Sequence, residues 1–143
     1  MIKLFLIFSL ISSNIFSSEM PLQSRELANK EMKSQNKHIV KLACAEMSKS
    51  LPKTIDKYTK LTTIQANEVT IEYIFEIDTG PKSDEAIKRD DHTRMREAVT
   101  IGTCKSSKRF LDADISLSYI YKNIKTKTEL FRFDINKESC FKL

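Results

Sequence analysis

The sequence predicts an α+β domain in which helices pack on a four-stranded antiparallel sheet, in the order α-β-β-α-β-β. Apolar residues recur every three or four positions over residues 39–51, a spacing that is typical of a helix. Apolar and polar residues alternate over residues 69–78, and again over 115–121 and 128–135, as in strands with one buried face. Two strand pairs with short connections favour an antiparallel sheet whose apolar face is covered by helix.

Residues 1–18 have the pattern of a signal peptide. A basic start, "MIK", is followed by the apolar run "LFLIFSLI" and by the small-residue region "SSNIFSS", which predicts cleavage after Ser17 or Ser18. The alternative is an uncleaved membrane anchor, but the run is short and broken by Ser and Asn for a hydrocarbon layer of about 30 Å. No cysteine follows the run, so we do not expect a lipid anchor. We expect residues 19–143 to form one domain, periplasmic or secreted, whose mature form does not span a membrane.

The chain carries a net charge of +5 at pH 7, which we interpret as ordinary solubility charge spread along the sequence. Attraction to an acidic partner or to a membrane surface is the alternative interpretation. No run of basic residues with interleaved aromatic residues is present, so nucleic-acid binding is not expected.

The first helix is expected over residues 19–50, with Ser24 as a candidate N-cap and Pro52 as the residue that ends it. Its first part, residues 19–37, is much more polar than the rest and predicts an exposed helical extension. An alternative is that this extension docks on a neighbour or pairs into a dimer, and the oligomeric state stays open.

The first hairpin is expected to pair residues 58–65 with residues 69–78. The connector between them, residues 66–68, contains Asn67, which tolerates a left-handed turn conformation.

The middle of the chain predicts helix again. After the breaker cluster "DTGPKSDE", with Ser83 as a candidate N-cap, a helix is expected over residues 84–99, and a shorter helical turn over 106–113. The last hairpin follows, with the polar turn "KNIKTK". Placing residue 122 opposite 128 puts Ile115 opposite Ile135.

The three cysteines predict one disulfide bond. Cys104 and Cys140 both emerge at the open end of the last hairpin, and an oxidising compartment favours their pairing. Closing this loop of about 36 residues is worth about 3–4 kcal/mol in the chain-entropy account. Cys44 lies on the apolar stripe of the first helix, where a free cysteine behaves as a small hydrophobic residue. A Cys44–Cys104 pair and an intermolecular bond are the alternatives.

Residues for catalysis or for a cofactor are not grouped in the sequence. His38 and His92 have no other histidine or cysteine three or four positions away, so no metal site is expected. The carboxylates beside His92 in "RDDH" are interpreted as a solvated helix face rather than as partners of a general base. The two glycines, Gly80 and Gly102, are too far apart to build a phosphate-binding loop.

Four segments together resemble small exported proteins of Gram-negative bacteria. They are "LPKTIDKYTKL", "EYIFEID", "CKSSKRFLDADISLSYIY" and "FDINKESC", which fall within residues 42–140. The resemblance implies a periplasmic location and a disulfide bond, and it implies no chemistry.

The function expected from these observations is that of an exported, non-catalytic interaction or binding protein, such as an adaptor, an inhibitor or an immunity-type protein, with a protein partner in the cell envelope. The alternative is a small-molecule carrier or a weak enzyme that uses a pocket between the sheet and the first helix. Tyr73, Tyr119 and Phe133, which fall on apolar strand faces, are the candidate lining of such a pocket.

Overall fold

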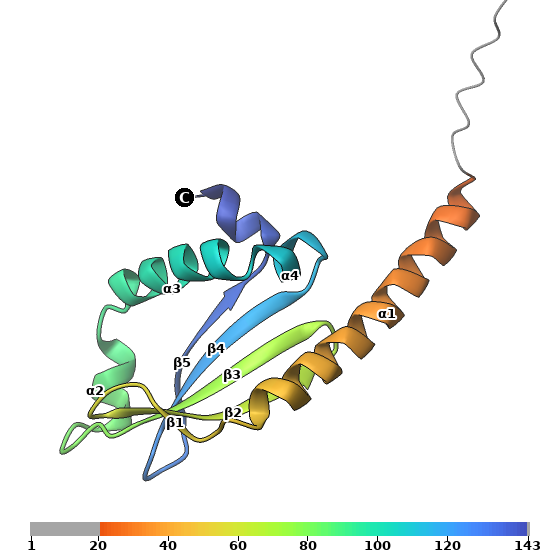
Figure 1. Cartoon of the computed structure of the whole chain (residues 1–143). Helices are drawn as coiled ribbons and strands as arrows, with labels where there is room; N and C mark the ends of the chain where they lie inside the picture. Colours follow the sequence, from red (N-terminus) through yellow and green to blue (C-terminus); the bar gives the residue numbers. More distant parts are fainter. Residues whose placement is uncertain (1–20, 143) are drawn as a thin grey trace, which may run out of the picture.

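The computed structural model describes residues 21–142, so the predicted signal peptide over residues 1–18 lies outside the described residues. The chain forms an α+β fold with a five-stranded sheet (Figure 1). Its elements are α1 (Leu22–Ser48), β1 (Lys53–Thr54), β2 (Thr59–Asn67), β3 (Thr70–Ile77), α2 (Asp84–Arg89), α3 (Thr93–Ser106), α4 (Lys108–Asp112), β4 (Ser116–Asn123), β5 (Glu129–Ile135) and the 3-10 helix η1 (Lys137–Lys142). Within these residues, no helix combines the length and the apolar character that a membrane crossing requires.

The sheet is mixed, so the prediction of four antiparallel strands is wrong. The strand order is β1-β2-β3-β4-β5, and β3 and β4 pair in parallel while the other neighbours are antiparallel. The chain between β3 and β4 contains α2, α3 and α4, and such a helical crossover returns the chain to the end where the previous strand began. The fifth strand, β1, is two residues long, which is too short to give a periodic pattern.

The connector of the first hairpin and the register of the second differ from the sequence-based expectation. In the first, β2 continues through Asn67, which pairs with Thr70, and Glu68 rather than Asn67 adopts the left-handed conformation, with φ of 53°. In the second, Leu117 rather than Ile115 pairs with Ile135, and the register shifts near Tyr121. A displacement of two residues keeps each side chain on its predicted face, because side chains alternate with a period of two.

The predicted helix over residues 84–99 is interrupted. Asp90 is extended between α2 and α3, and α3 runs on to Ser106. At the break, the Asp91 carboxylate accepts hydrogen bonds from the backbone and the side chain of Thr93. Such local bonds compete with helix formation, which the spacing of apolar residues cannot reveal.

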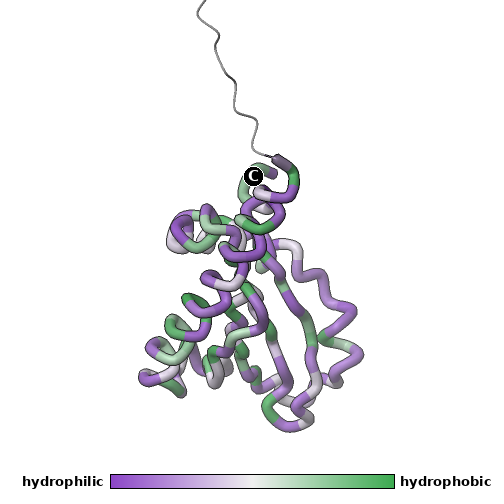
Figure 2. The backbone as a smooth tube through the Cα atoms, turned by 90° about the vertical axis from the view of Figure 1, so that its right-hand side faces the viewer, coloured by the Kyte–Doolittle hydropathy of each residue, from purple (hydrophilic) through white to green (hydrophobic). Residues whose placement is uncertain are grey.

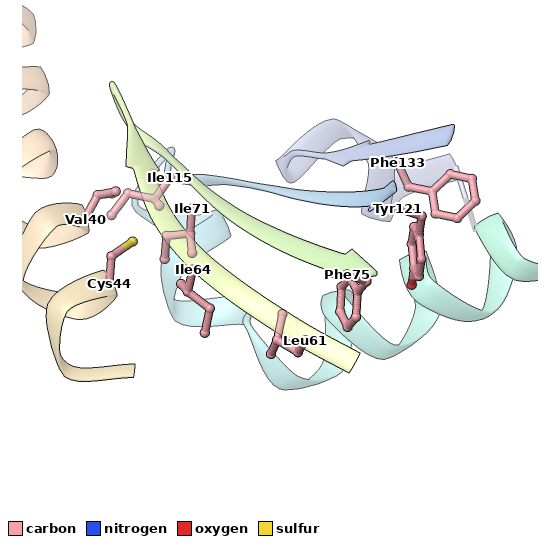
Figure 3. Packing of buried hydrophobic residues seen from close by; sticks show 9 residues of the cluster. All are labelled: Val40, Cys44, Leu61, Ile64, Ile71, Phe75, Ile115, Tyr121 and Phe133. Atoms are coloured by element: carbon pink, nitrogen blue, oxygen red, sulfur yellow. The ribbon is translucent and has the colours of Figure 1, made fainter. Parts of the chain in front are cut away.

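The core lies between one face of the sheet and the helices, which gather on the same side of it (Figure 2). Val40 and Cys44 of α1 point toward Ile71 and Ile64, while Phe75 and Tyr121 lie near α3 (Figure 3). The buried residues of this cluster are Val40, Cys44, Leu61, Ile64, Ile71, Phe75, Ile115, Tyr121 and Phe133.

The N-terminal half of α1 projects away from the sheet (Figure 1). Residues 21–35 are exposed, and the first buried residue is Asn36, whose Nδ2 donates to the carbonyl oxygen of Ala113 at 2.7 Å. The helix begins one residue after Pro21, so the candidate cap Ser24 lies inside the first turn instead. Only the C-terminal half of α1 therefore contributes to the core.

Candidate functional site

Aromatic side chains form a continuous row across the helix-covered face of the sheet. Tyr73 stacks on Tyr119 at 5.1 Å between ring centroids, and Phe75 stacks on Tyr121 at 4.7 Å. These pairs are register partners on β3 and β4, so their side chains lie on the same face of neighbouring strands. The row continues from Tyr121 to Phe131, also at 4.7 Å, and ends near the start of α3.

The three predicted lining residues lie on three adjacent strands, where they pack rather than line a hollow. Tyr119 is the register partner of both Tyr73 and Phe133. A hydrogen bond joins the Tyr119 hydroxyl to Thr103 Oγ1 at 2.8 Å, and the Tyr73 hydroxyl lies 3.6 Å from Met47 Sδ. Burial raises the pKa of Tyr73 to about 12. Phe133 is 1% exposed. Neither of the two hollows described below is lined by these three side chains.

The first hollow, which we call the α2–α3 pocket, lies at the end of the aromatic row. It has a volume of about 550 Å³ and opens between α2, the start of α3 and the loop that follows β3. Charged residues stand at its rim, including an ion pair between Lys82 and Asp90 at 3.7 Å. Its apolar lining consists of Tyr58, Ile77, Pro81, Ile87, Met95 and Phe131.

Local hydrogen bonds position the loop over residues 78–83. Gly80 has φ of 58°, which its missing side chain permits, and its N–H donates to Asp78 Oδ1 at 3.0 Å. Ser83 Oγ accepts a hydrogen bond from the N–H of Ala86 and caps α2, as the sequence predicts.

Asn123, buried at the end of β4, ties this loop to the sheet. Its Nδ2 lies 3.2 Å from Thr79 Oγ1 and 2.6 Å from Asp84 Oδ1. The hydrogen bond from Asn123, followed by that from Thr126, lowers the pKa of Asp84. The pocket wall is thus held by the sheet.

His92 forms part of the pocket wall. Its ring stacks on Phe131 at 4.1 Å, and its Nε2 lies 2.9 Å from the carbonyl oxygen of Ile87. Because a carbonyl only accepts hydrogen bonds, Nε2 carries the proton in this contact. The second histidine, His38, is exposed on α1. Over residues 21–142, no three or more His, Cys, Asp or Glu side chains are grouped as metal ligands would be.

The second hollow, the α1–α4 groove, lies between the middle of α1 and the segment around α4. It has a volume of about 510 Å³ and is lined mainly by Ile39, Phe110, Ala113 and Ile115, with Arg109 at its side.

The cysteines are arranged as one bridge and one free thiol in the described chain. A disulfide joins Cys104 of α3 to Cys140 of η1, with 5.7 Å between the Cα atoms. Cys44 is free and buried among core residues of α1, and burial raises the pKa of its thiol. The disulfide holds the C-terminal helix against α3.

Sequence reasoning missed the α2–α3 pocket. Its apolar residues come from four separate segments, and Ile87 and Met95 were expected only as the thin apolar face of one continuous helix. The Gly-Pro step at residues 80–81 was the one sequence signal near the pocket, since it indicates a loop between strand and helix.

No protein-family model matches the chain, and no curated protein matches it in sequence. Three solved structures are similar. A protein of Pseudomonas aeruginosa described as secreted matches with a TM-score of 0.68 and 13% identity, covering 76% of this chain and 96% of that one. The type II secretion system pilotin EpsS of Vibrio vulnificus matches with a TM-score of 0.63 and 14% identity, covering 78% and 96% of the two chains. The pilotin AspS of Vibrio cholerae matches with a TM-score of 0.60 and 19% identity, covering 79% and 99%. The chain therefore shares its fold with small exported and secretion-system proteins of Gram-negative bacteria.

Proposed function

We propose that this chain is an exported, non-catalytic binding protein that serves a secretion system in the Gram-negative cell envelope, in the manner of a pilotin. The observation that carries the proposal is the match to two pilotins over 96% and 99% of their lengths. Nearly the whole length of each pilotin is therefore matched by this chain. The Pseudomonas aeruginosa neighbour, described as secreted, agrees with an exported role.

The surface supports a binding role. Protein interfaces combine an apolar centre with a polar rim, and aromatic residues contribute a large share of their binding energy. The α2–α3 pocket has this composition, with Met95 and Phe131 inside and the Lys82–Asp90 ion pair at the edge. Tyr58, which is part of the lining, has 56% of its surface exposed. We propose that the pocket receives an apolar side chain of the partner protein and that Tyr58 covers that side chain.

A non-catalytic role accounts for the groups that face the pocket. The lining is mainly apolar, and the proton on His92 Nε2 is used in the contact with Ile87. The ring of His92 is also stacked on Phe131, so it serves as a packed wall of the pocket.

Site-specific crosslinking in the source bacterium tests the proposal. A photoreactive phenylalanine analogue at Tyr58 should form an adduct with one envelope protein, which mass spectrometry identifies as a secretion-system component. The matched control is the same analogue at Phe141, which is 79% exposed on η1 and lies outside the pocket lining. Adducts at Phe141 equal to those at Tyr58, or a Tyr58 partner unrelated to secretion, would contradict the proposal.

A further inference from the structure

From the sequence we expected the positive charge to be spread along the chain. It is instead concentrated in the first part of the chain. Residues 22–67, which span α1, β1, β2 and the segments between them, contain nine lysine or arginine residues and four acidic residues. Residues 68–143 contain fourteen of each, and residues 1–21 contain one of each. The whole net charge of +5 therefore lies in residues 22–67.

Four of these basic residues form a row on one side of α1. Lys30, Lys33, Lys37 and Lys41 are three or four positions apart, a spacing that places side chains on the same face of a helix. The row is about 16 Å long at 1.5 Å per residue. Lys30, Lys33 and Lys41 are exposed, and Lys37 is half-buried. We call these four residues the lysine row.

Glu68, at the tip of the β2–β3 hairpin, shows which way the row faces. Its carboxylate forms an ion pair with Lys37 Nζ. The hydrogen bond and the charge of Lys37, followed by the charges of Lys33 and Lys41, lower the pKa of Glu68. Lys37 thus contacts this carboxylate directly, while Lys30, Lys33 and Lys41 have no ion-pair partner in the described part of the chain.

We propose that the lysine row is a docking surface for an acidic segment of a partner protein. The carboxylates of that segment would form ion pairs with Lys30, Lys33 and Lys41, as Glu68 does with Lys37. A helix with Glu or Asp every three or four residues matches the row, because its carboxylates repeat at the same rise. The inference is independent of the secretion role proposed above, since the row and the α2–α3 pocket lie on different elements.

The arrangement of apolar residues on α1 favours a protein over a lipid surface. A helix that lies on a membrane presents an apolar face beside its basic one. At about 100° per residue, the exposed apolar residues of α1 are spread over most of the helix circumference instead of forming one narrow face; they are Leu22, Leu27, Met32, Ile39 and Leu42. The side that carries the row continues toward the N-terminus with Gln23 and Glu26, which are polar.

A binding measurement with a defined probe tests the docking surface. The probe is a fluorescent synthetic helical peptide with Glu at every third or fourth position, and the same peptide with Gln in place of Glu is its neutral counterpart. The exported protein should bind the Glu peptide in fluorescence anisotropy at low salt. It should lose this binding near 1 M salt, where charges are screened beyond about 3 Å.

Two triple variants with the same change in net charge separate the row from overall charge. In the first, Lys30→Glu, Lys33→Glu and Lys41→Glu are combined. In the control, Lys88→Glu, Lys105→Glu and Lys142→Glu change three exposed lysines of the electrically neutral part of the chain. Each charge reversal removes an attraction and adds a repulsion, so the row variant should lose about tenfold in affinity. The control should lose less than about twofold.

Three results would overturn the inference. One is an equal loss of affinity in both triple variants, which would mean that the peptide responds to net charge alone. Another is equal binding of the Glu and Gln peptides. The third is binding of the protein to phosphatidylglycerol vesicles, lost in the row variant, with no binding of the Glu peptide. Circular dichroism of both variants checks that each has kept its fold.

Discussion

Replacing Glu72 with Ala should destabilise the sheet through a hydrogen-bond network on the face opposite the helices. Glu72 is 5% exposed and accepts hydrogen bonds from Gln65 Nε2 at 2.7 Å and from Asn67 Nδ2 at 3.0 Å. Arg132 NH1 lies 3.5 Å from the same carboxylate. The network therefore links β2, β3 and β5.

The magnitude follows from the kind of bonds that are lost. A hydrogen bond to a charged group contributes about 1.5–3 kcal/mol to stability. Gln65, Asn67 and Arg132 are exposed, so after the substitution their polar groups can form hydrogen bonds with water instead, which reduces the loss. We expect Glu72→Ala to lower the free energy of unfolding by about 2 kcal/mol, and the melting midpoint by roughly 6–12 °C.

The pH dependence has a definite sign. Burial alone would raise the pKa of Glu72, but the hydrogen bonds from Asn67 and Gln65 and the charge of Arg132 lower it below its ordinary value. A lowered pKa gives stability that is present above the pKa of the unfolded chain and is lost as the pH falls. The difference between the wild type and Glu72→Ala should thus be largest near pH 7 and shrink toward pH 3.

Urea unfolding of both proteins at pH 7 and pH 3 measures the effect. Glu129→Ala is the matched control, because Glu129 also pairs with Arg132 but is exposed, and it should cost less than about 1 kcal/mol. A cost for Glu72→Ala that equals the control, or that is unchanged between the two pH values, would refute the reasoning.

Three further predictions concern the cysteines and the core. Cys140→Ser should lower the free energy of unfolding by about 4 kcal/mol, because the bridge to Cys104 closes a loop with a sequence separation of 36. Calorimetry measures the change, and an unchanged melting midpoint would contradict the prediction. Cys44 should stay unreactive toward a thiol reagent in the native protein and react after unfolding, because burial raises the pKa of its thiol; rapid modification of the native protein would contradict this. Val40→Ala should lower the free energy of unfolding by about 1–3 kcal/mol because Val40 is 0% exposed. Leu42→Ala, on the exposed side of α1, should lower it by less than about 0.5 kcal/mol. Equal losses in urea unfolding would show that α1 does not pack on the sheet through Val40.

The faces of the strands could be predicted from the sequence, but the direction of their pairing could not. Alternation correctly placed Ile71 and Tyr73 of β3 under the helices and Glu72 on the opposite face. The same alternation occurs in parallel and antiparallel strands, so it carries no information on direction. The parallel pairing of β3 with β4 follows from the helical crossover, and the sequence-based interpretation had treated those helices only as a cover for the sheet.

The candidate site was harder to predict than the fold. The arrangement of Cys104 and Cys140 followed from short distances along the chain around one hairpin. The α2–α3 pocket instead needs the interruption at Asp90, which allows Ile87 and Met95 to line the same hollow from two helices. That interruption comes from hydrogen bonds of Asp91, and the spacing of apolar residues does not record them.

The parallel pairing between β3 and β4 has a consequence for the order in which the chain can fold. If the chain emerges from its N-terminus, the β2–β3 hairpin is complete before residues 116–123 are available. Until then the backbone groups along one edge of β3 lack their strand partner, and exposed edges of this kind join other chains readily. The first hairpin is therefore protected only after the last third of the chain is available, and a chain that stalls within the crossover is expected to aggregate.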